Sequence, residues 1–135
     1  MYYPWSNYNF GGRILNHIVN GNVTVIKILL EIGFLNVNDH FDITKEPTLL
    51  HVIARYGCAK YKDMIDLLLQ YGINIDKPST SSVVSQAIIF KNFAIAAYIY
   101  SKGGIFDRNE VNIYNTISDV DLFEHFNYEI SRLAN

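Results

Sequence analysis

The residues best suited to binding a metal are four histidines and one cysteine in a chain of 135 residues. None of the ligand spacings typical of a zinc site, such as His-x3-His or Cys-x2-Cys, occurs among them. The segment containing Asp39, His40 and Asp42 clusters carboxylates around an imidazole, but a solvated loop of this composition needs no such role. The sequence therefore predicts no metal site and no bound cofactor.

The groups that could act in nucleophilic or acid–base catalysis are equally isolated. Cys58 is the only thiol, and the neighbouring Lys60 and Lys62 could lower its pKa and so activate it. Nucleophilic catalysis also needs a base within reach, and no histidine adjoins Cys58 in the sequence. Glu124 and Glu129 are five positions apart on a predicted helix, so they do not face one another. We expect no catalytic site.

The overall composition fits one folded domain spanning residues 1–135. Half of the residues are hydrophobic, 18% are charged and the formal net charge is −2, which lies outside the regime of disordered chains. The absence of a basic excess argues against nucleic-acid binding, and the longest apolar runs are too short to cross a bilayer. A single cysteine fits a reducing compartment. We expect an intracellular, cytoplasmic domain without membrane insertion.

Codon usage gives an indirect indication of origin. Isoleucine, asparagine, lysine and tyrosine supply 49 of the 135 residues, and their codons are rich in A and T. Genomes of that kind are common among intracellular bacteria, protists and large viruses. The composition therefore favours a pathogen- or virus-encoded protein that acts in the host cytosol.

Internal repetition organises the chain. A short apolar helical pattern that ends at a glycine, the residue that most easily adopts the left-handed backbone conformation, occurs three times, at residues 26–33, 65–72 and 96–103. The three glycines lie 39 and 31 residues apart. This spacing brackets a repeating unit of about 33 residues.

A second short helical pattern precedes each of these segments, at residues 12–21, 48–57 and 82–91. Thr48 and Ser82 are natural N-caps, because their hydroxyl groups can accept hydrogen bonds from early helical amides. Each unit is therefore predicted to be a pair of short antiparallel helices followed by a loop.

The middle unit reads Thr-Leu-Leu-His-x-x-Ala-x-x-Gly at residues 48–57 and Leu-Leu-Leu-x-x-Gly-Ile-Asn-Ile-Asp at residues 67–76. This pattern resembles the ankyrin repeat, although Leu49 stands where that family has proline. The first unit has lost the Thr-Pro-Leu-His start of the family, and Lys91 replaces the glycine between the helices of the third. The resemblance covers about residues 12–107. It implies an all-α, ankyrin-repeat-like solenoid of about four stacked helix–turn–helix units.

The domain is predicted to consist of five parts: an aromatic N-terminal segment at 1–11, repeats at 12–38, 48–76 and 82–107, and capping helices at 108–135. In the last part, a helix over 109–117 is capped by Asp107 or Asn109. A longer final helix, capped by Ser118 or Asp119, runs to Leu133. The predicted core is Leu29, Leu30, Leu50, Ala54, Leu67, Leu68, Val84, Ala87, Ile99 and Phe126.

The resemblance to ankyrin repeats also implies a function. Such a stack exposes a concave surface formed by the loops between units and the inward face of the first helices. We expect this surface to bind a protein partner without catalysis; the alternative is a self-associating scaffold or oligomerisation module. The predicted partner-binding residues are Asn20, Asp39, His40, Phe41, Lys45, Arg55, Tyr56, Lys77, Ile89 and Phe90.

Three further assignments follow. Ile89 and Phe90 either contact the partner or pack into neighbouring units. The family's histidine makes a structural hydrogen bond, so His51 is expected to be structural too. Five aromatic residues in the N-terminal segment either fold over the first repeat as a cap or anchor a partner or second copy of the chain: Tyr2, Tyr3, Trp5, Tyr8 and Phe10.

Overall fold

The computed structural model of the chain describes residues 8–38, 48–75, 82–117 and 121–134, with the backbone alone for 8–11 and 113–117. Every regular element in these ranges is an α-helix. The all-α fold is therefore confirmed. The helices are α1 (Tyr8–Val19), α2 (Val23–Glu31), α3 (Leu49–Tyr56), α4 (Tyr61–Gln70), α5 (Val83–Ile89), α6 (Phe93–Ser101), α7 (Arg108–Ile117) and α8 (Leu122–Ala134).

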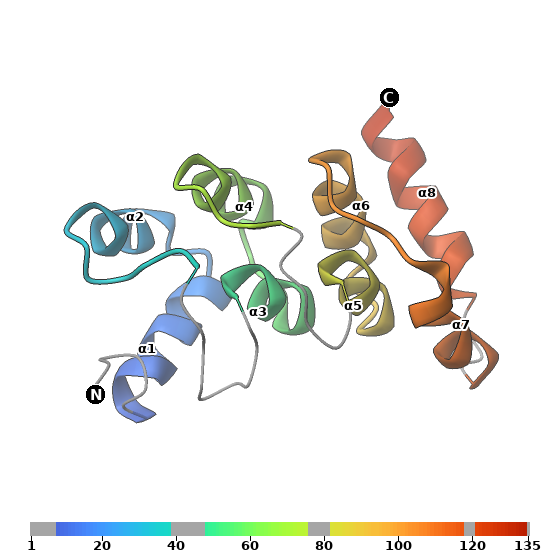
Figure 1. Cartoon of the computed structure of the whole chain (residues 1–135), viewed down its shortest axis with the longest axis horizontal. Coiled ribbons are helices and arrows are strands. Elements are labelled where there is room, and N and C mark those ends of the chain that lie inside the picture. The colour runs from blue at the N-terminus through green and yellow to red at the C-terminus, as the bar shows by residue number, and fades with distance from the viewer. Residues whose placement is uncertain (1–7, 39–47, 76–81, 118–120, 135) are drawn as a thin grey trace.

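The helices pair along the chain, and the four pairs stack in a line (Figure 1). We call α1, α3, α5 and α7 the inner row, and α2, α4, α6 and α8 the outer row. Within each row, every helix contacts the next one. The arrangement confirms the prediction of about four stacked helix–turn–helix units, which we number from the N-terminus.

The predicted capping chemistry of the repeats is confirmed. The hydroxyl oxygen of Thr48 accepts a hydrogen bond from the amide of His51 (3.4 Å), and that of Ser82 accepts one from the amide of Ser85 (3.3 Å). The glycines predicted to end the second helices all have positive φ: Gly33, Gly72 and Gly103.

The first helix starts earlier than predicted. α1 begins at Tyr8, four residues before the expected start at residue 12. Two consecutive glycines at 11 and 12 lie inside it, although each costs about 1 kcal/mol relative to alanine in a helix interior. Ile14 and Ile18 of α1 are buried, so tertiary packing outweighs this local cost. Residues 1–7 and the side chains of Tyr8 and Phe10, which belong to the predicted aromatic cap, lie outside the described part of the chain.

The fourth unit confirms one predicted cap and corrects another. Asp107 caps α7, since its Oδ1 accepts a hydrogen bond from the amide of Asn109 (2.9 Å). The prediction that Ser118 or Asp119 caps the last helix is wrong. α8 begins at Leu122, and the carboxylate of the preceding Asp121 accepts a hydrogen bond from the amide of Glu124 (3.1 Å). Residues 118–120 are not among the described residues.

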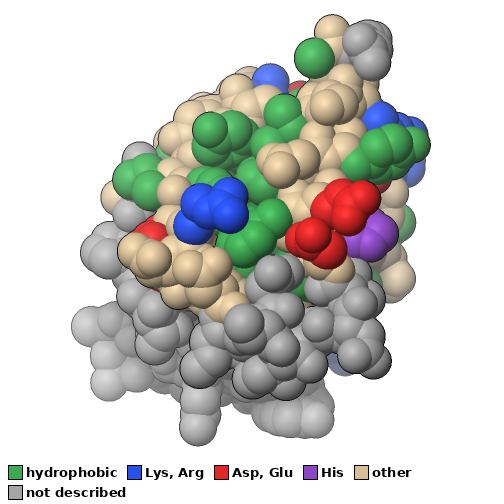
Figure 2. Space-filling model, turned by 90° about the vertical axis from the view of Figure 1, so that its right-hand side faces the viewer, with side chains coloured by type: hydrophobic (Ala, Val, Ile, Leu, Met, Phe, Trp, Pro, Cys, Tyr) green, Lys and Arg blue, Asp and Glu red, His purple; other side chains and the backbone are tan. Residues whose placement is uncertain are grey.

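α8 closes the C-terminal end of the stack as an amphipathic helix. Of the apolar side chains that follow one another at helical spacing along α8, Phe126 is buried, Phe123 and Ile130 are half-buried, and Leu133 is exposed. Among its acidic, basic and histidine residues, Glu124, His125 and Arg132 are exposed and Glu129 is half-buried. Figure 2 views this end of the molecule and shows hydrophobic, charged and polar side chains interspersed over it, as an end unit that faces water requires.

Nine of the ten predicted core residues are buried: Leu30, Leu50, Ala54, Leu67, Leu68, Val84, Ala87, Ile99 and Phe126. The tenth, Leu29, is only half-buried. It lies on α2, the first helix of the outer row, which has a neighbour in that row on one side only.

Polar side chains tie neighbouring units together. Between the first two units, the amide group of Asn38 donates to the carbonyl of Gly72 (3.1 Å) and accepts from the amide of Asn74 (2.8 Å). Between the last two units, the carboxylate of Glu110 accepts from both the amide and the hydroxyl of Ser82 (3.0–3.2 Å). These bonds connect backbone groups at the ends of helices and loops, so they fix how one unit sits on the next.

The outer row has its own tie between the second and third units. The phenol of Tyr98 on α6 donates to the carboxylate of Asp66 on α4 (2.7 Å). The ammonium groups of Lys62 and Lys102 lie 6.0 and 5.2 Å from the ring centroid of Tyr98, within the range of cation–π attraction. Tyr61 meets the same ring edge-on.

The interior leucine of α4 tests the stacked core. Leu68 is fully buried, so we expect Leu68→Ala to lower the free energy of unfolding by roughly 2–5 kcal/mol. Chemical denaturation followed by circular dichroism measures this loss. Ile32→Ala is the control: this side chain is 66% exposed, and its truncation should change the free energy by no more than about 0.5 kcal/mol. Equal effects of the two substitutions would contradict the assigned core.

The tie between α4 and α6 predicts a pH dependence. Burial, followed by the hydrogen bond to Asp66, raises the pKa of Tyr98 to about 12, whereas an unfolded tyrosine has a pKa of about 10. The stabilisation is therefore complete below about pH 10 and is lost as the pH rises towards about 12. We expect the free energy of unfolding to fall more steeply over this range for the wild type than for Tyr98→Phe. Parallel pH profiles for the two chains would refute this assignment.

Candidate partner-binding surface

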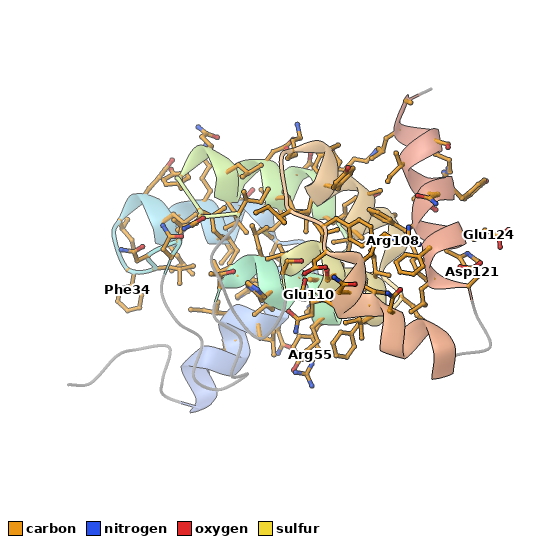
Figure 3. All side chains as sticks on the ribbon, turned by 45° about the vertical axis from the view of Figure 1, so that its right-hand side comes forward. Phe34, Arg55, Arg108, Glu110, Asp121 and Glu124 are labelled. Atoms are coloured by element: carbon orange, nitrogen blue, oxygen red, sulfur yellow. The ribbon has the colours of Figure 1, made fainter. Side chains whose placement is uncertain are left out.

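Three predicted binding residues meet at the junction of the second and third units. The guanidinium carbon of Arg55 lies 5.4 Å from the ring centroid of Tyr56 and 5.0 Å from that of Phe90. Both rings are substantially exposed, Tyr56 at 44% and Phe90 at 43%. Figure 3 shows Arg55 extending away from the end of α3. We call Arg55, Tyr56 and Phe90 the Arg–aromatic cluster; its contacts are within cation–π range.

The local fold explains why these side chains meet. Arg55 and Tyr56 are the last two residues of α3, and Phe90 directly follows α5. The side-chain amide of Asn92 donates to the carbonyls of Ala54 (2.8 Å) and Arg55 (3.4 Å). The last carbonyls of a helix have no partner within the helix, so this bond satisfies the end of α3 and holds the third unit against it.

The linkers inside the first three units lie next to one another. They comprise residues 20–22, 57–60 and 90–92. The amide of Ala59 donates to the carbonyl of Val19 (2.9 Å), which places the second linker on the end of α1, while Asn92 places the third linker on the end of α3. We call these three linkers, together with the last two residues of α3, the linker edge.

The remaining predicted binding residues fall into three groups. Asn20 is exposed within the first linker. Ile89 is half-buried and packs against the core, whereas its neighbour Phe90 is exposed. The predicted loop residues lie outside the described part of the chain and so do not belong to the site that the structure defines: Asp39, His40, Phe41, Lys45 and Lys77.

Asn92 has an important contact that the sequence reasoning missed. A comparison of the first and third linkers contains the signal, because Asn22 and Asn92 occupy the same place, directly before the second helix of the unit. Asn22 hydrogen-bonds to the ring of His17 (2.9 Å) rather than to a neighbouring unit. The shared position therefore singles out Asn92 in the sequence, but the group to which each asparagine hydrogen-bonds depends on what packs beside it.

The described histidines have structural surroundings. His51 is fully buried, and its Nδ1 lies 2.9 Å from the hydroxyl oxygen of Thr48. The ring of His125 stacks on Phe93 with centroids 4.9 Å apart. Within the described ranges, no three histidine, cysteine, aspartate or glutamate side chains group in a way that could hold a metal ion.

Burial, and not the neighbouring lysines, determines the direction of the pKa shift of Cys58. The thiol is half-buried, and burial raises its pKa above the usual value, with a smaller opposing effect from a hydrogen bond to the backbone of Lys60. Burial disfavours the thiolate because the charged form loses solvation. Cys58 is therefore a poorer nucleophile than an exposed cysteine.

A hollow of about 580 Å³ lies between α7 and α8. The guanidinium carbon of Arg108 lies 4.1 Å from the ring centroid of Phe123 at this place, and the carboxylate of Asp121 caps α8. Figure 3 labels Arg108, Asp121 and Glu124 at this end of the molecule. Arg108 packs on a ring of α8 and Asp121 caps that helix. These two charged residues of the hollow therefore help to hold α8 in place.

No helix in the described part of the chain is both long and apolar enough to span a bilayer.

The raised pKa of Cys58 predicts slow alkylation. We expect the rate of iodoacetamide modification of the folded chain to reach half its maximum at a higher pH than in the urea-unfolded chain, because the thiolate is the reactive form. Mass spectrometry at several pH values measures both profiles. A folded profile centred at or below the unfolded one would show that the lysines prevail over burial.

Comparison with known proteins adds one match. Residues 46–77 match the family model of the ankyrin repeat. No curated protein and no solved structure is significantly similar to the chain.

The matched residues include the whole of α3 and α4, with the Thr48 cap and the buried His51 at their start. The resemblance drawn from the sequence is thus confirmed at the middle unit. Ankyrin repeats are generally non-enzymatic modules that bind other proteins. The second helix pair of this chain thus matches the ankyrin repeat, and it stands within an all-α stack of four helix pairs.

Proposed function

We propose that the chain binds another protein through the face formed by its inner row, with the Arg–aromatic cluster at the centre of the contact. The observation that carries the proposal is the position of Arg55, within 5.4 Å of the ring centroids of both Tyr56 and Phe90, on rings that are exposed. Arginine and tyrosine are among the residue types that contribute most to binding energy at protein interfaces.

The cluster is also held in place before any partner arrives. Its residues lie at helix ends, and Asn92 bonds the third unit to the end of α3. A side chain that is already ordered loses less conformational entropy on binding than a mobile one. This favours the Arg–aromatic cluster as an anchor.

The other predicted residues would form the periphery of the same contact. Asn20 and Ile89 belong to the inner row or its linkers. The loop residues Asp39, His40, Phe41, Lys45 and Lys77 follow second helices in the sequence, where ankyrin-like stacks present their loops. Peripheral contacts exclude water around an anchor and contribute less energy each.

The proposal extends to the origin of the partner. The A/T-rich codon usage implied by the composition supports a pathogen or virus as the source and a host protein as the partner. The single cysteine supports an intracellular site of action.

Alanine substitution tests the proposed centre. We expect the double variant Arg55→Ala, Tyr56→Ala to lose the proteins that the wild-type chain retains in affinity capture from a cell lysate, read by quantitative mass spectrometry. Both side chains are exposed, so the helical circular-dichroism signal should stay close to that of the wild type.

The outer row offers a matched control. Arg132 lies 5.9 Å from the ring centroid of the exposed Tyr128 on α8, so Tyr128→Ala, Arg132→Ala removes the same side-chain types from another face. This control should retain the captured proteins. Retention by the Arg55 and Tyr56 variant would contradict the proposal. A molecular mass that rises with concentration in light scattering and falls in that variant would favour self-association instead.

A further inference from the structure

Basic and acidic residues are segregated along the chain. The inner helices of the first three units, with their caps and linkers, comprise residues 8–22, 48–60 and 82–92. These stretches hold four basic residues and no acidic one: Arg13, Arg55, Lys60 and Lys91. The other seven basic and all thirteen acidic residues lie elsewhere, in a chain whose net charge is −2. These three inner helices and their linkers therefore carry a charge opposite to the net charge of the chain.

Lys91 occupies a position that disfavours lysine. Its φ is 65°, and it is the only described residue other than glycine with a positive φ. The equivalent residue of the first linker is Gly21, with φ 74°. A side chain is unfavourable in this left-handed region, because its Cβ comes too close to the neighbouring carbonyl oxygen. Such strain is typically kept where the residue serves a function, and here it keeps an exposed ammonium group on the linker edge.

Lys60 also stands against local preference. It is the N-cap of α4, where its side chain makes no capping bond, and a helix N-terminus carries a partial positive charge that disfavours lysine. Gly21 leaves room for it: a Cβ added there would lie 2.8 Å from the backbone nitrogen and 3.1 Å from Cβ of Lys60. Lys60 thus packs closely against the first linker, and a side chain at position 21 would prevent this contact.

These three cations share one edge with two exposed rings. Lys60 rests on the first linker, Asn92 ties the linker of Lys91 to the end of α3, and Arg55 lies at that end over Tyr56 and Phe90. Helix electrostatics favour a cation at the C-terminal ends of α3 and α5, where Arg55 and Lys91 lie, but not at the N-terminus of α4, so they do not account for Lys60. A binding surface for negative charge accounts for all three.

We propose that the linker edge binds an acidic segment of a partner protein. Carboxylates of the segment would pair with Arg55, Lys60 and Lys91, and an apolar side chain next to them would pack against Tyr56 and Phe90. This inference rests on the proposed function and specifies the partner of the same surface. Protein is favoured over nucleic acid because the chain carries a net charge of −2, and a nucleic-acid binder typically relies on a strong basic excess.

A random-sequence peptide library displayed on phage tests the preference, because it offers the surface acidic, basic and neutral segments alike. Peptides selected by the wild-type chain should be enriched in aspartate and glutamate next to aromatic or aliphatic residues. Fluorescence anisotropy of a selected peptide should show Kd rising with salt, because screening weakens exposed ion pairs. Arg55→Glu, Lys91→Glu should raise Kd by at least about tenfold.

Two comparison variants separate charge from folding. Lys27→Glu, Lys62→Glu makes the same change of charge on α2 and α4 of the outer row, and it should change Kd by less than about twofold. Lys91→Gly removes the charge and relieves the strained φ. It should raise the midpoint of thermal unfolding while weakening peptide binding several-fold, so a loss of fold cannot explain the weaker binding.

Four outcomes would overturn the inference: selected peptides without an acidic excess, an affinity indifferent to salt, a Kd unchanged by the Arg55 and Lys91 reversal, or tighter binding of a mixed-sequence single-stranded DNA oligonucleotide. The proposed function fails separately. Peptides without acidic residues that still lose binding on Tyr56→Ala overturn only the acidic preference. Peptides whose Kd changes with neither Tyr56→Ala nor Arg55→Ala would contradict the proposed binding face itself.

Discussion

Each helix pair of this chain buries its apolar face against the pairs next to it, and that dependence governs the rest of the structure. Ile53, Leu68 and Ile88 are fully buried in successive units, yet no unit has enough apolar surface to fold alone. Polar side chains then set the geometry of each junction. Asn38 and Glu110 do so by bonding to backbone groups of a neighbouring unit. Apolar packing thus holds the stack together, and a few directed bonds decide how successive units are placed.

The candidate binding surface is a product of that placement. Arg55 and Phe90 belong to different units, and they meet because Asn92 completes the end of α3. A surface assembled across a junction combines chemistry that no single repeat carries. The third unit also contributes to this surface by departing from the ankyrin pattern. Lys91 stands in place of glycine and adds a cation where the repeat pattern has no side chain.

Local features of the fold were predictable from the sequence. Helix pairs, the caps at Thr48 and Ser82, and nearly all of the core follow from periodicity and capping chemistry, which act within one turn or one unit. The start of α1 was not predictable in this way, because buried residues downstream outweigh two glycines. The raised pKa of Cys58 was not predictable for a related reason, because its burial comes from tertiary packing that its neighbours in the sequence do not reveal.

The binding surface was predictable only in part. Arg55, Tyr56 and Phe90 were identified by their positions in the repeat, but their meeting depends on docking between units. Because the cluster spans that junction, a partner that contacts residues on both sides would hold the second and third pairs together. Helix pairs at the end of a linear stack ordinarily detach without disturbing the middle. With a partner bound across this junction, the third and fourth pairs would no longer unfold independently of the first two. Partner binding would therefore also stabilise the stack against partial unfolding.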